Sequence, residues 1–283
     1  MDPALSFEVP RTLRLGDRLL DLRTPRVMGV LNVTPDSFYA GSRLGGVDDV
    51  LRSAEAMCAA GATFLDVGGY STRPGADDVP PDEERARVVP VVEALARRFP
   101  DAYVSVDTFR AEVAAAAAAA GATLVNDASG GADPAMFATC ARLDVAYVLM
   151  HTRGTPRTMQ GLTDYDDLAG EVIGFLQRKL YLLREHGVGD VLVDPGFGFA
   201  KTRPQNFELL ARLEEFQVLG CPLLVGVSRK SMIWKTLGVR PDEALNGTTV
   251  LNTLALRSGA NVLRTHDVKE ASEAITLLSQ LPQ

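Results

Sequence analysis

Several ionisable and amide side chains in this chain lie at the ends of short apolar runs. Asp107 ends the run YVSVD, Asn126 lies in TLVND, and Asp194 lies in VLVDP. Lys230 follows PLLVGVS, so we expect its ammonium to be partly removed from water and to face a ligand. Carboxylates gathered in one place repel one another unless basic groups or ligand donors lie between them. A flat heterocycle with an N–C–NH₂ edge offers the pair of donors that a carboxylate accepts.

A second set of residues is suited to binding an anion. Arg264 and His266 are two apart in NVLRTH, so in a strand their side chains share one face. An arginine and a histidine placed together suit a phosphate or a pyrophosphate. Thr72 and Arg73, in the segment STRPG, add further anion donors. The alternatives are a core histidine with satisfied hydrogen bonds and an ordinary surface turn.

The elements that must position these residues repeat one unit, in which an apolar strand is followed by a polar loop and a helix. Several of the expected helices end in a glycine, which is typical of a helix C-terminus. The expected strands are 27–33, 63–68, 103–107, 123–127, 146–151, 191–195, 222–228 and 261–266. Helix-length segments between them include 47–60, 82–98, 110–120, 167–186 and 246–258.

Eight strands alternating with eight helices predict an α/β fold, a single (β/α)₈ TIM barrel. A doubly wound open sheet would predict a GxGxxG turn after the first strand, and the sequence has none there. We expect one domain over residues 1–283, with a short N-terminal β-hairpin at about 6–24 that turns at Gly16-Asp17, and the barrel at about 26–283. The active site of such a barrel lies at the carboxyl ends of its strands. The polar residues described above would all meet there, although each could individually be only a loop start or a helix cap.

Composition and charge narrow the class of protein. The net charge of −7 argues against a nucleic-acid-binding protein with a broad positive field. The three cysteines, Cys58, Cys140 and Cys221, are widely spaced, which indicates buried thiols of a reducing compartment. The first residues, MDPALSFEVP, lack the pattern of a signal peptide, and no apolar run approaches the roughly 18 residues of a membrane span. We therefore expect a cytoplasmic protein with no membrane partner.

The ensemble of motifs resembles one family. NVTPDSF, DVGGYSTRPGA, SVDT, VNDASG, HTRGTPRTMQ, DPGFGFAK, GVSRKSMI and RTHDV occur in the order and spacing of the dihydropteroate synthases, from about residue 27 to 268. The combination is specific, although a short piece such as RTHD alone would be weak. The chain departs from the family pattern at Tyr70, where the second loop commonly has a glutamate.

The resemblance implies a role for each matching residue. It implies that the pterin ring is held by Asp107, Asn126, Asp194 and Lys230, in a pocket lined by Met150 and Phe199. It also implies that Arg264 and His266 bind the pyrophosphate of that substrate, with Thr72 and Arg73 nearby. Asn32 would help to hold Mg²⁺. The region for p-aminobenzoate would be formed by Phe38, Thr72, Arg73, Pro74 and Ser228.

The implied reaction breaks a C–O bond of 6-hydroxymethyl-7,8-dihydropterin pyrophosphate and forms a C–N bond to p-aminobenzoate. Lys230 and Asp107 are the expected catalytic residues, and no covalent enzyme intermediate is expected. Two alternatives share the pterin site: a non-catalytic pterin-binding paralogue and a methyltetrahydrofolate:corrinoid methyltransferase. The second has no use for the STRPG loop or the Arg-x-His pair. The resemblance is also compatible with a homodimer.

Overall fold

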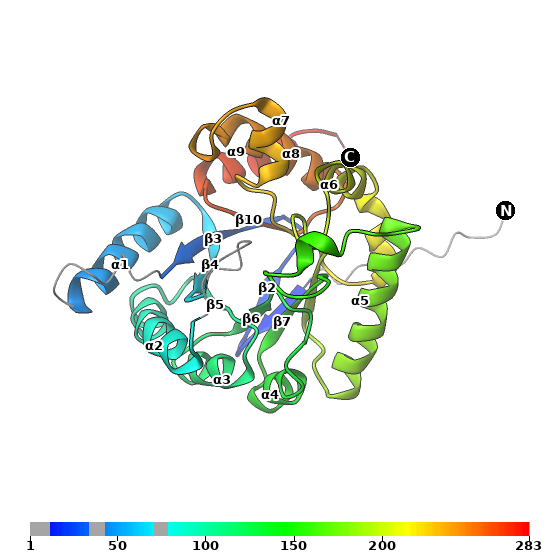
Figure 1. Cartoon of the computed structure of the whole chain (residues 1–283). Coiled ribbons are helices and arrows are strands. Elements are labelled where there is room, and N and C mark those ends of the chain that lie inside the picture. Colours follow the sequence, from blue (N-terminus) through cyan, green and yellow to red (C-terminus); the bar gives the residue numbers. More distant parts are fainter. Residues whose placement is uncertain (1–11, 34–42, 71–78, 283) are drawn as a thin grey trace.

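The structure is a computed structural model of the chain, and it describes residues 12–33, 43–70 and 79–282. Its main body is a ring of strands surrounded by helices (Figure 1). A small hairpin precedes the ring in the sequence.

The N-terminal hairpin consists of β1 (Thr12–Leu15) and β2 (Arg18–Asp21), which pair antiparallel. The turn falls at Gly16 and Asp17, as the sequence predicted, and Gly16 adopts the left-handed backbone (φ +63°) that a tight two-residue turn requires. Apolar and polar residues alternate along the hairpin, so one of its faces is buried. That face carries Leu13, Leu15, Leu20 and Leu22.

Eight parallel strands make the ring, which confirms the predicted barrel. They are β3 (Arg26–Asn32), β4 (Ala62–Gly68), β5 (Tyr103–Asp107), β6 (Leu124–Asp127), β7 (Ala146–Met150), β8 (Val191–Asp194), β9 (Leu224–Val225) and β10 (Val262–Thr265). Neighbours along the sheet run β8-β7-β6-β5-β4-β3-β10-β9. One parallel bridge, between Val193 and Leu223, connects the two ends of this order, so the barrel is nearly closed.

The predicted strand 222–228 was wrong in length, because only Leu224 and Val225 form a strand. After them the backbone turns away from the sheet: the amide of Lys230 donates to the carbonyl of Val227 (3.1 Å). Arg229 takes a left-handed conformation (φ +52°), and its amide donates to the Thr248 hydroxyl at 3.0 Å. The turn ends the strand early and brings Lys230 over the barrel mouth.

Helices follow the strands around the outside of the ring. They are α1 (Arg43–Ala59), α2 (Pro81–Arg98), α3 (Ala111–Ala119), α4 (Met136–Leu143), α5 (Leu168–Glu185), α6 (Arg203–Ala211), α7 (Ser231–Leu237), α8 (Leu245–Arg257) and α9 (Val268–Leu278). The expected count of eight was therefore too low, even within the described residues. The additional helix is α7, which ends at the left-handed Gly238 before Pro241 starts a new turn that leads into α8.

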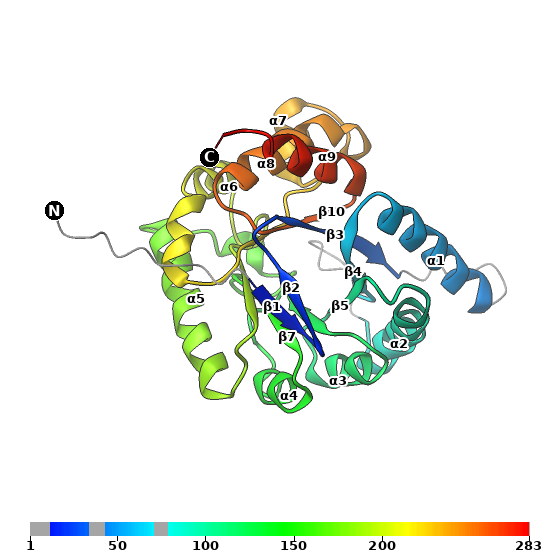
Figure 2. The same ribbon diagram turned by 180° about the vertical axis from the view of Figure 1, so that it is seen from behind.

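Two apolar layers hold the fold together. The larger one lies between the strands and the surrounding helices. The smaller one fills the amino-terminal half of the barrel, where residues such as Met28, Phe64 and Leu124 pack with the leucines of the hairpin. Figure 2 shows the hairpin lying across this end of the barrel. Since the apolar filling is at the amino-terminal end, buried polar side chains are concentrated toward the opposite end.

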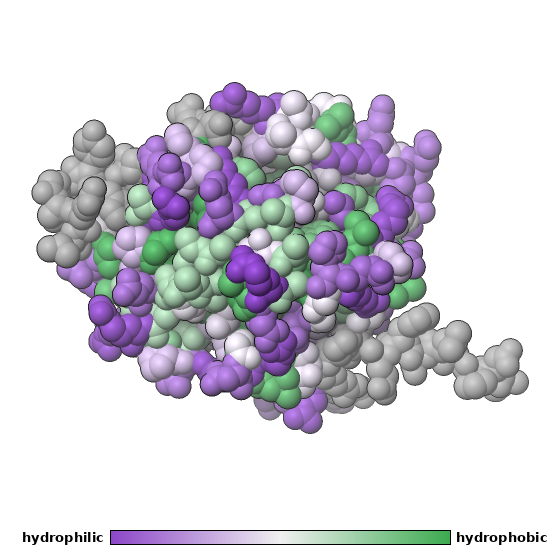
Figure 3. All heavy atoms as spheres, turned by 90° about the horizontal axis from the view of Figure 1, so that it is seen from below, coloured by the Kyte–Doolittle hydropathy of each residue, from purple (hydrophilic) through white to green (hydrophobic). Residues whose placement is uncertain are grey.

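The outer surface over α3 and α4 is mixed in character. In Figure 3, hydrophilic side chains surround a paler, weakly hydrophobic area, as an alanine-rich helix such as α3 would produce. None of the helices within the described ranges is long and apolar enough to cross a membrane.

Candidate functional site

The carboxyl ends of the strands bring the predicted polar residues to one place. Asp107 is the last residue of β5, Asp194 is the last residue of β8, and Asn126 is the penultimate residue of β6. Arg264 projects from β10, and Lys230 follows the turn after β9. These five residues were widely separated in the sequence, and the closing of the barrel gathers them at one mouth.

Arg264 lies between two carboxylates. Its Nε donates to Asp66 Oδ2 and its Nη2 donates to Asp107 Oδ2, both at 2.7 Å. Burial by itself lowers the pKa of Arg264, but Asp66 and Asp107 outweigh it and raise the pKa above its ordinary value, so the guanidinium stays charged. The expectation that the clustered carboxylates need a basic partner is confirmed.

Asp66 lies within β4, two residues before the strand ends at Gly68. The Asp66 side chain is fully buried inside the barrel, below the rim. It accepts a second hydrogen bond from Asn126 Nδ2 at 3.0 Å, which fixes the orientation of that amide. Asp66 Oδ1 and the nearby Ser105 hydroxyl have no partner among the described residues, a polar spot that an internal water would satisfy.

The carboxyl group of Asp107 has a pKa near neutrality, so both its protonated and its charged form are accessible. Burial raises the pKa of Asp107 to about 7, against the lowering effect of Arg264. The neighbouring charge of Asp66 raises it further. A carboxyl group with a pKa near neutrality at a strand end is typical of an active site.

Asp194 and Lys230 form the other side of the mouth. Burial raises the pKa of Asp194, and the charge of Lys230 opposes this effect. The ammonium of Lys230 donates to the carbonyl of Phe197 and lies 5.2 Å from the centre of the Phe199 ring. Burial lowers the pKa of Lys230 to about 8, again with Asp194 opposing. The predicted desolvation of Lys230 is confirmed.

Apolar side chains complete this side of the site. Met150, at the end of β7, is buried. Phe199 is partly exposed and follows β8, where its ring contacts the Lys230 ammonium. The stem of Lys230 runs past Gly198, where a Cβ would stand 3.4 Å from Lys230 Cδ. Together these groups could surround a flat ring that the carboxylates and the amide hold by its edges.

Ser228 and His266 form a second polar pair at the rim. The Ser228 hydroxyl lies 3.0 Å from His266 Nδ1 and accepts a hydrogen bond from the His266 amide at 3.1 Å. His266 is exposed and lies one residue beyond the end of β10. An exposed imidazole held by a neighbouring hydroxyl suits the binding of an anion from solvent.

Four predicted residues, Phe38, Thr72, Arg73 and Pro74, lie outside the described residues. Asn32, the predicted metal ligand, is the exposed last residue of β3. A Cβ placed on Gly68 would stand 3.8 Å from Asn32 Oδ1 and 3.7 Å from Asp107 Oδ2, so these two oxygens lie close to the same glycine. Nowhere in the described part of the chain do three histidine, cysteine or acidic side chains gather as metal ligands.

Sequence reasoning left two residues of this region unassigned. In the sequence, His151 stands out only as the first residue of the motif HTRGTPRTMQ, and Lys201 only as the last residue of DPGFGFAK. Both are buried, and Lys201 Nζ lies 2.9 Å from His151 Nδ1. The signal that could have found them is a lysine at the end of a glycine-rich segment directly before a helix cap.

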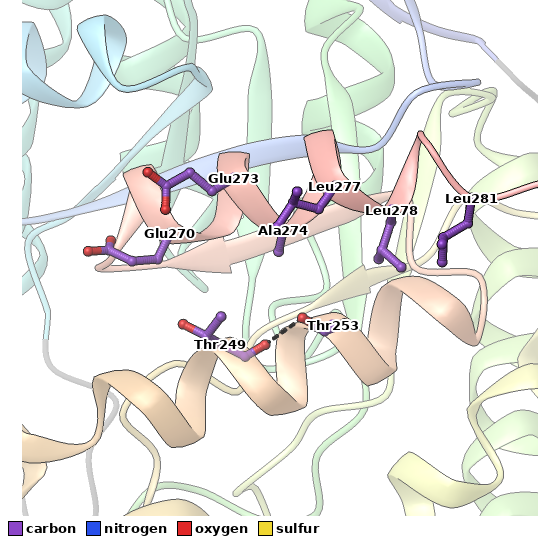
Figure 4. A pocket seen from close by; sticks show the side chains of 8 residues that line it. All are labelled: Thr249, Thr253, Glu270, Glu273, Ala274, Leu277, Leu278 and Leu281. Atoms are coloured by element: carbon purple, nitrogen blue, oxygen red, sulfur yellow. Dashed lines mark hydrogen bonds between the residues drawn. The ribbon is translucent and has the colours of Figure 1, made fainter.

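A separate groove lies on the outside of the barrel, between α8 and α9 (Figure 4). Leu277, Leu278 and Leu281 face Thr253 across it, with Glu270 at its other end. Its lining holds none of the residues at the strand ends, so the groove carries no argument about catalysis.

Comparison with known proteins agrees with the geometry. A family model described as pterin binding enzyme matches residues 28–266. The dihydropteroate synthase of Escherichia coli K12 is 45% identical over 261 residues, which cover 92% of each chain. That of Synechocystis is 44% identical over 274 residues, covering 95% of this chain and 94% of the relative.

Solved structures of dihydropteroate synthases are also similar to this chain, in fold as well as in sequence. A Yersinia pestis dihydropteroate synthase, solved with a sulfonamide drug complex, superposes with a TM-score of 0.89 at 44% identity and covers 95% of this chain and 98% of its own. A Xanthomonas albilineans dihydropteroate synthase with 4-aminobenzoic acid also gives 0.89, at 39% identity, covering 96% and 99%. Both the fold and the sequence over nearly the full length are shared. This chain therefore belongs to the family of pterin-binding enzymes that contains the dihydropteroate synthases.

Proposed function

We infer that the chain is a transferase of folate biosynthesis with the activity of its relatives. It condenses 6-hydroxymethyl-7,8-dihydropterin pyrophosphate with p-aminobenzoate to give 7,8-dihydropteroate and pyrophosphate. The observation that carries this conclusion is the set of polar groups at the barrel mouth. Asp107, Asn126, Asp194 and Lys230 lie near one another there, and Arg264 neutralises the buried carboxylates.

The pterin ring complements this set of groups. Its amino-pyrimidine edge offers adjacent donors, which Asp194 accepts, while the Lys230 ammonium donates to ring acceptors. Asp107 and Asn126 bind other edges of the ring. Asn126 gives an N–H to Asp66, so its amide oxygen is the group that would accept from the ligand. Met150 and Phe199 contact the faces of the ring.

The pyrophosphate leaves toward the rim, where His266 is held by Ser228. His266 and Arg264 stabilise the charge that develops on the departing oxygen, and Arg73 of the second loop joins them. Ser228, Phe38, Thr72 and Pro74 form the region that receives p-aminobenzoate. As the C–O bond breaks, positive charge develops on the exocyclic carbon, and the carboxylate of Asp107 stabilises it. The electron pair of the broken C–O bond stays on the departing pyrophosphate. The arylamine nitrogen then forms the C–N bond and releases one N–H proton to solvent.

A magnesium ion is the cofactor that the family resemblance implies. Asn32 Oδ1 and the Asp107 carboxylate lie near one glycine at the rim, and there is no all-protein cage in the described residues. This donor set fits Mg²⁺, which keeps several waters and binds largely through substrate phosphates. Asn32 would hold the ion, which when bound adds neutralising charge to the pyrophosphate.

The cysteines agree with a location in the cytoplasm. The thiols of Cys58, Cys140 and Cys221 are free, which suits that reducing compartment.

A homodimer is the assembly that the proposal includes. It would cover apolar side chains on the outer surface, where Leu254 is 49% and Leu277 is 71% exposed. Sedimentation of the purified chain tests the dimer directly.

Turnover tests the function. The purified chain is mixed with the pterin pyrophosphate, p-aminobenzoate and Mg²⁺, and dihydropteroate and pyrophosphate are followed by chromatography. We expect product that is lost on adding EDTA and falls by about 100-fold in Lys230→Ala, since a buried charged hydrogen bond is removed. Lys269→Ala is the matched control, because Lys269 is an exposed lysine of α9. Tight pterin binding without product would instead indicate the non-catalytic paralogue, with Tyr70→Glu as the next variant.

A further inference from the structure

Lys201 is a buried lysine whose nitrogen is fully surrounded by acceptors. The residue is 5% exposed. Its Nζ lies 2.9 Å from His151 Nδ1 and donates to the carbonyls of Gly196 and Phe199, each at 3.0 Å. An ammonium has three N–H donors, so this arrangement uses all of them. A buried lysine is stable only when its donors are matched in this way, which indicates that the surrounding loop is built around it.

The loop that Lys201 holds has an unusual backbone. Between β8 and Lys201, three residues are left-handed: Gly196 (φ +74°), Gly198 (φ +81°) and Ala200 (φ +49°). A Cβ on Gly196 would stand 1.9 Å from the carbonyl oxygen of His151, so the loop packs directly on the end of β7. The left-handed conformation of Ala200 costs free energy, and other contacts must offset it. The bonds from Lys201 to the Gly196 and Phe199 carbonyls are contacts of this kind.

The same loop supplies one half of the candidate pterin site. The Gly196 amide donates to Asp194 Oδ1 at 2.7 Å. The Phe197 carbonyl accepts from the Lys230 ammonium, and the Phe199 ring lies beside that ammonium. Asp194 and Lys230 therefore each bond to the backbone of this loop, and Phe199 belongs to it. Lys201 bonds to the same loop through the carbonyls of Gly196 and Phe199.

His151 is a suitable acceptor for this lysine. It is buried, its ring packs edge-on against Phe175 at 5.0 Å, and its amide donates to the Asp194 carbonyl at 2.9 Å. Burial lowers the pKa of His151 to about 2, so the ring is neutral. Burial also lowers the pKa of Lys201 to about 7. A neutral imidazole can accept from the ammonium and, in its other tautomer, donate to the amine, so the bond persists in both states of Lys201.

We propose that Lys201, with His151 as its partner, is a positioning residue for pterin binding, which holds the 195–200 loop in its ligand-ready conformation before substrate arrives. The inference rests on the proposed place of the pterin beside Asp194 and Lys230. It predicts that Lys201 acts on pterin affinity and leaves the p-aminobenzoate side, at Ser228, largely unchanged.

The test compares three variants with the wild type. Lys201→Met keeps the length of the side chain and removes its donors, and Lys201→Gln restores part of them. Lys179→Met is the matched control, because Lys179 also donates to a loop carbonyl, that of Gly131 at 3.1 Å, away from Asp194 and Lys230. Affinity for 6-hydroxymethylpterin is measured by calorimetry, thermal stability by calorimetric melting, and KM for p-aminobenzoate at saturating pterin pyrophosphate.

We expect Lys201→Met to weaken pterin binding by at least about tenfold, as the loss of a preorganised site implies. The KM for p-aminobenzoate should stay within about twofold, and Lys201→Gln should recover part of the affinity. Lys179→Met should lower the melting temperature without changing pterin affinity. If Lys201→Met lowers the melting temperature and leaves pterin affinity intact, Lys201 is only structural and the proposal fails.

Two measurements keep the result interpretable. Should Lys201→Met not fold, His151→Phe removes the acceptor while retaining the ring against Phe175, and it should weaken pterin binding in the same direction. An unchanged affinity in that variant would overturn the proposal. The pterin affinity of Lys230→Ala is measured alongside. If Lys230→Ala binds pterin as the wild type does, the proposed place of the pterin is wrong. If Lys230→Ala loses affinity while the Lys201 and His151 variants do not, only the role of Lys201 is refuted.

Discussion

The two ends of the barrel differ in the side chains that fill them, which are apolar at one end and polar or charged at the other. The amino-terminal end is filled by apolar side chains and closed by the hairpin leucines. The carboxyl-terminal end holds Asp66, Asp107, Asn126 and Arg264, which are joined by hydrogen bonds and ion pairs. It also holds Asp194, which lies near the charges of Lys230 and Arg264. Burial of apolar area is favourable in itself, whereas a buried charge is tolerated only with its partners. The apolar end therefore stabilises the fold, whereas the polar end lowers its stability in return for preorganised polar groups.

The largest effect is expected at the polar end. Arg264→Leu leaves the buried Asp66 and Asp107 without a cation, and we expect the free energy of unfolding to fall by about 3–5 kcal/mol near pH 8. Protonation of the Asp107 carboxyl relieves the repulsion. Burial already raises the pKa of Asp107 to about 7 against the lowering effect of Arg264, so without Arg264 its folded pKa stays above the unfolded value and the stability of the variant should rise again as the pH falls toward 5. Urea unfolding at several pH values measures both effects.

The control for that experiment is Arg85→Leu, which breaks an exposed ion pair with Asp82. Its cost should be below about 1 kcal/mol and nearly independent of pH. A loss in Arg264→Leu that is equally small, or that does not depend on pH, would contradict the account of the polar end.

The apolar end should respond in stability alone. Leu15 is 1% exposed in the core beneath the barrel, and Leu15→Ala should lower the free energy of unfolding by about 2–4 kcal/mol through the cavity that it leaves. If the hairpin and the barrel form one domain, unfolding stays a single transition. The values of kcat and KM at a temperature where the variant is folded should match those of the wild type.

Leu19 offers a matched control on the same hairpin, because it is 67% exposed. Leu19→Ala should change stability by less than about 0.5 kcal/mol. A clear change of pterin affinity in Leu15→Ala would show that the two ends are coupled and would break the comparison.

The smallest effect concerns the charge of Lys230. Burial lowers its pKa to about 8, so the ammonium loses its proton as the pH rises through 8. If pterin binding needs the charged form, affinity should fall above that pH by about tenfold per pH unit. Calorimetric titration with 6-hydroxymethylpterin between pH 6.5 and 9.5 measures this, with the ionisation of the free pterin followed separately.

Lys230→Arg sharpens the pH experiment, because an arginine keeps its charge over this range. Whatever the absolute pterin affinity of Lys230→Arg, this affinity should no longer decline above pH 8. A decline of the same shape in Lys230→Arg would assign the titration to another group, such as Asp107.

Local patterns in the sequence were sufficient for the architecture. Alternating strands and helices predicted the barrel, and the boundaries of α2 and β5 agree with the expected 82–98 and 103–107 to within a residue. The turn at Gly16-Asp17 followed from the same reasoning. These features depend on hydrophobic periodicity and turn chemistry within a few residues, which a single sequence contains. Asp107, Asn126, Asp194 and Lys230 could be placed at the barrel mouth because the fold itself defines where strands end.

The partners of these residues were decided only by the tertiary structure. Arg264 and Asp66 are 198 positions apart, and their ion pair exists because β10 and β4 both flank β3 in the closed ring. The pairing of Lys201 with His151 likewise depends on the loop after β8 packing on the end of β7. No local pattern encodes such contacts, since they arise from how distant strands meet around the barrel. The sequence by itself determined which groups reach the site, and the closing of the barrel determined which groups hold one another there.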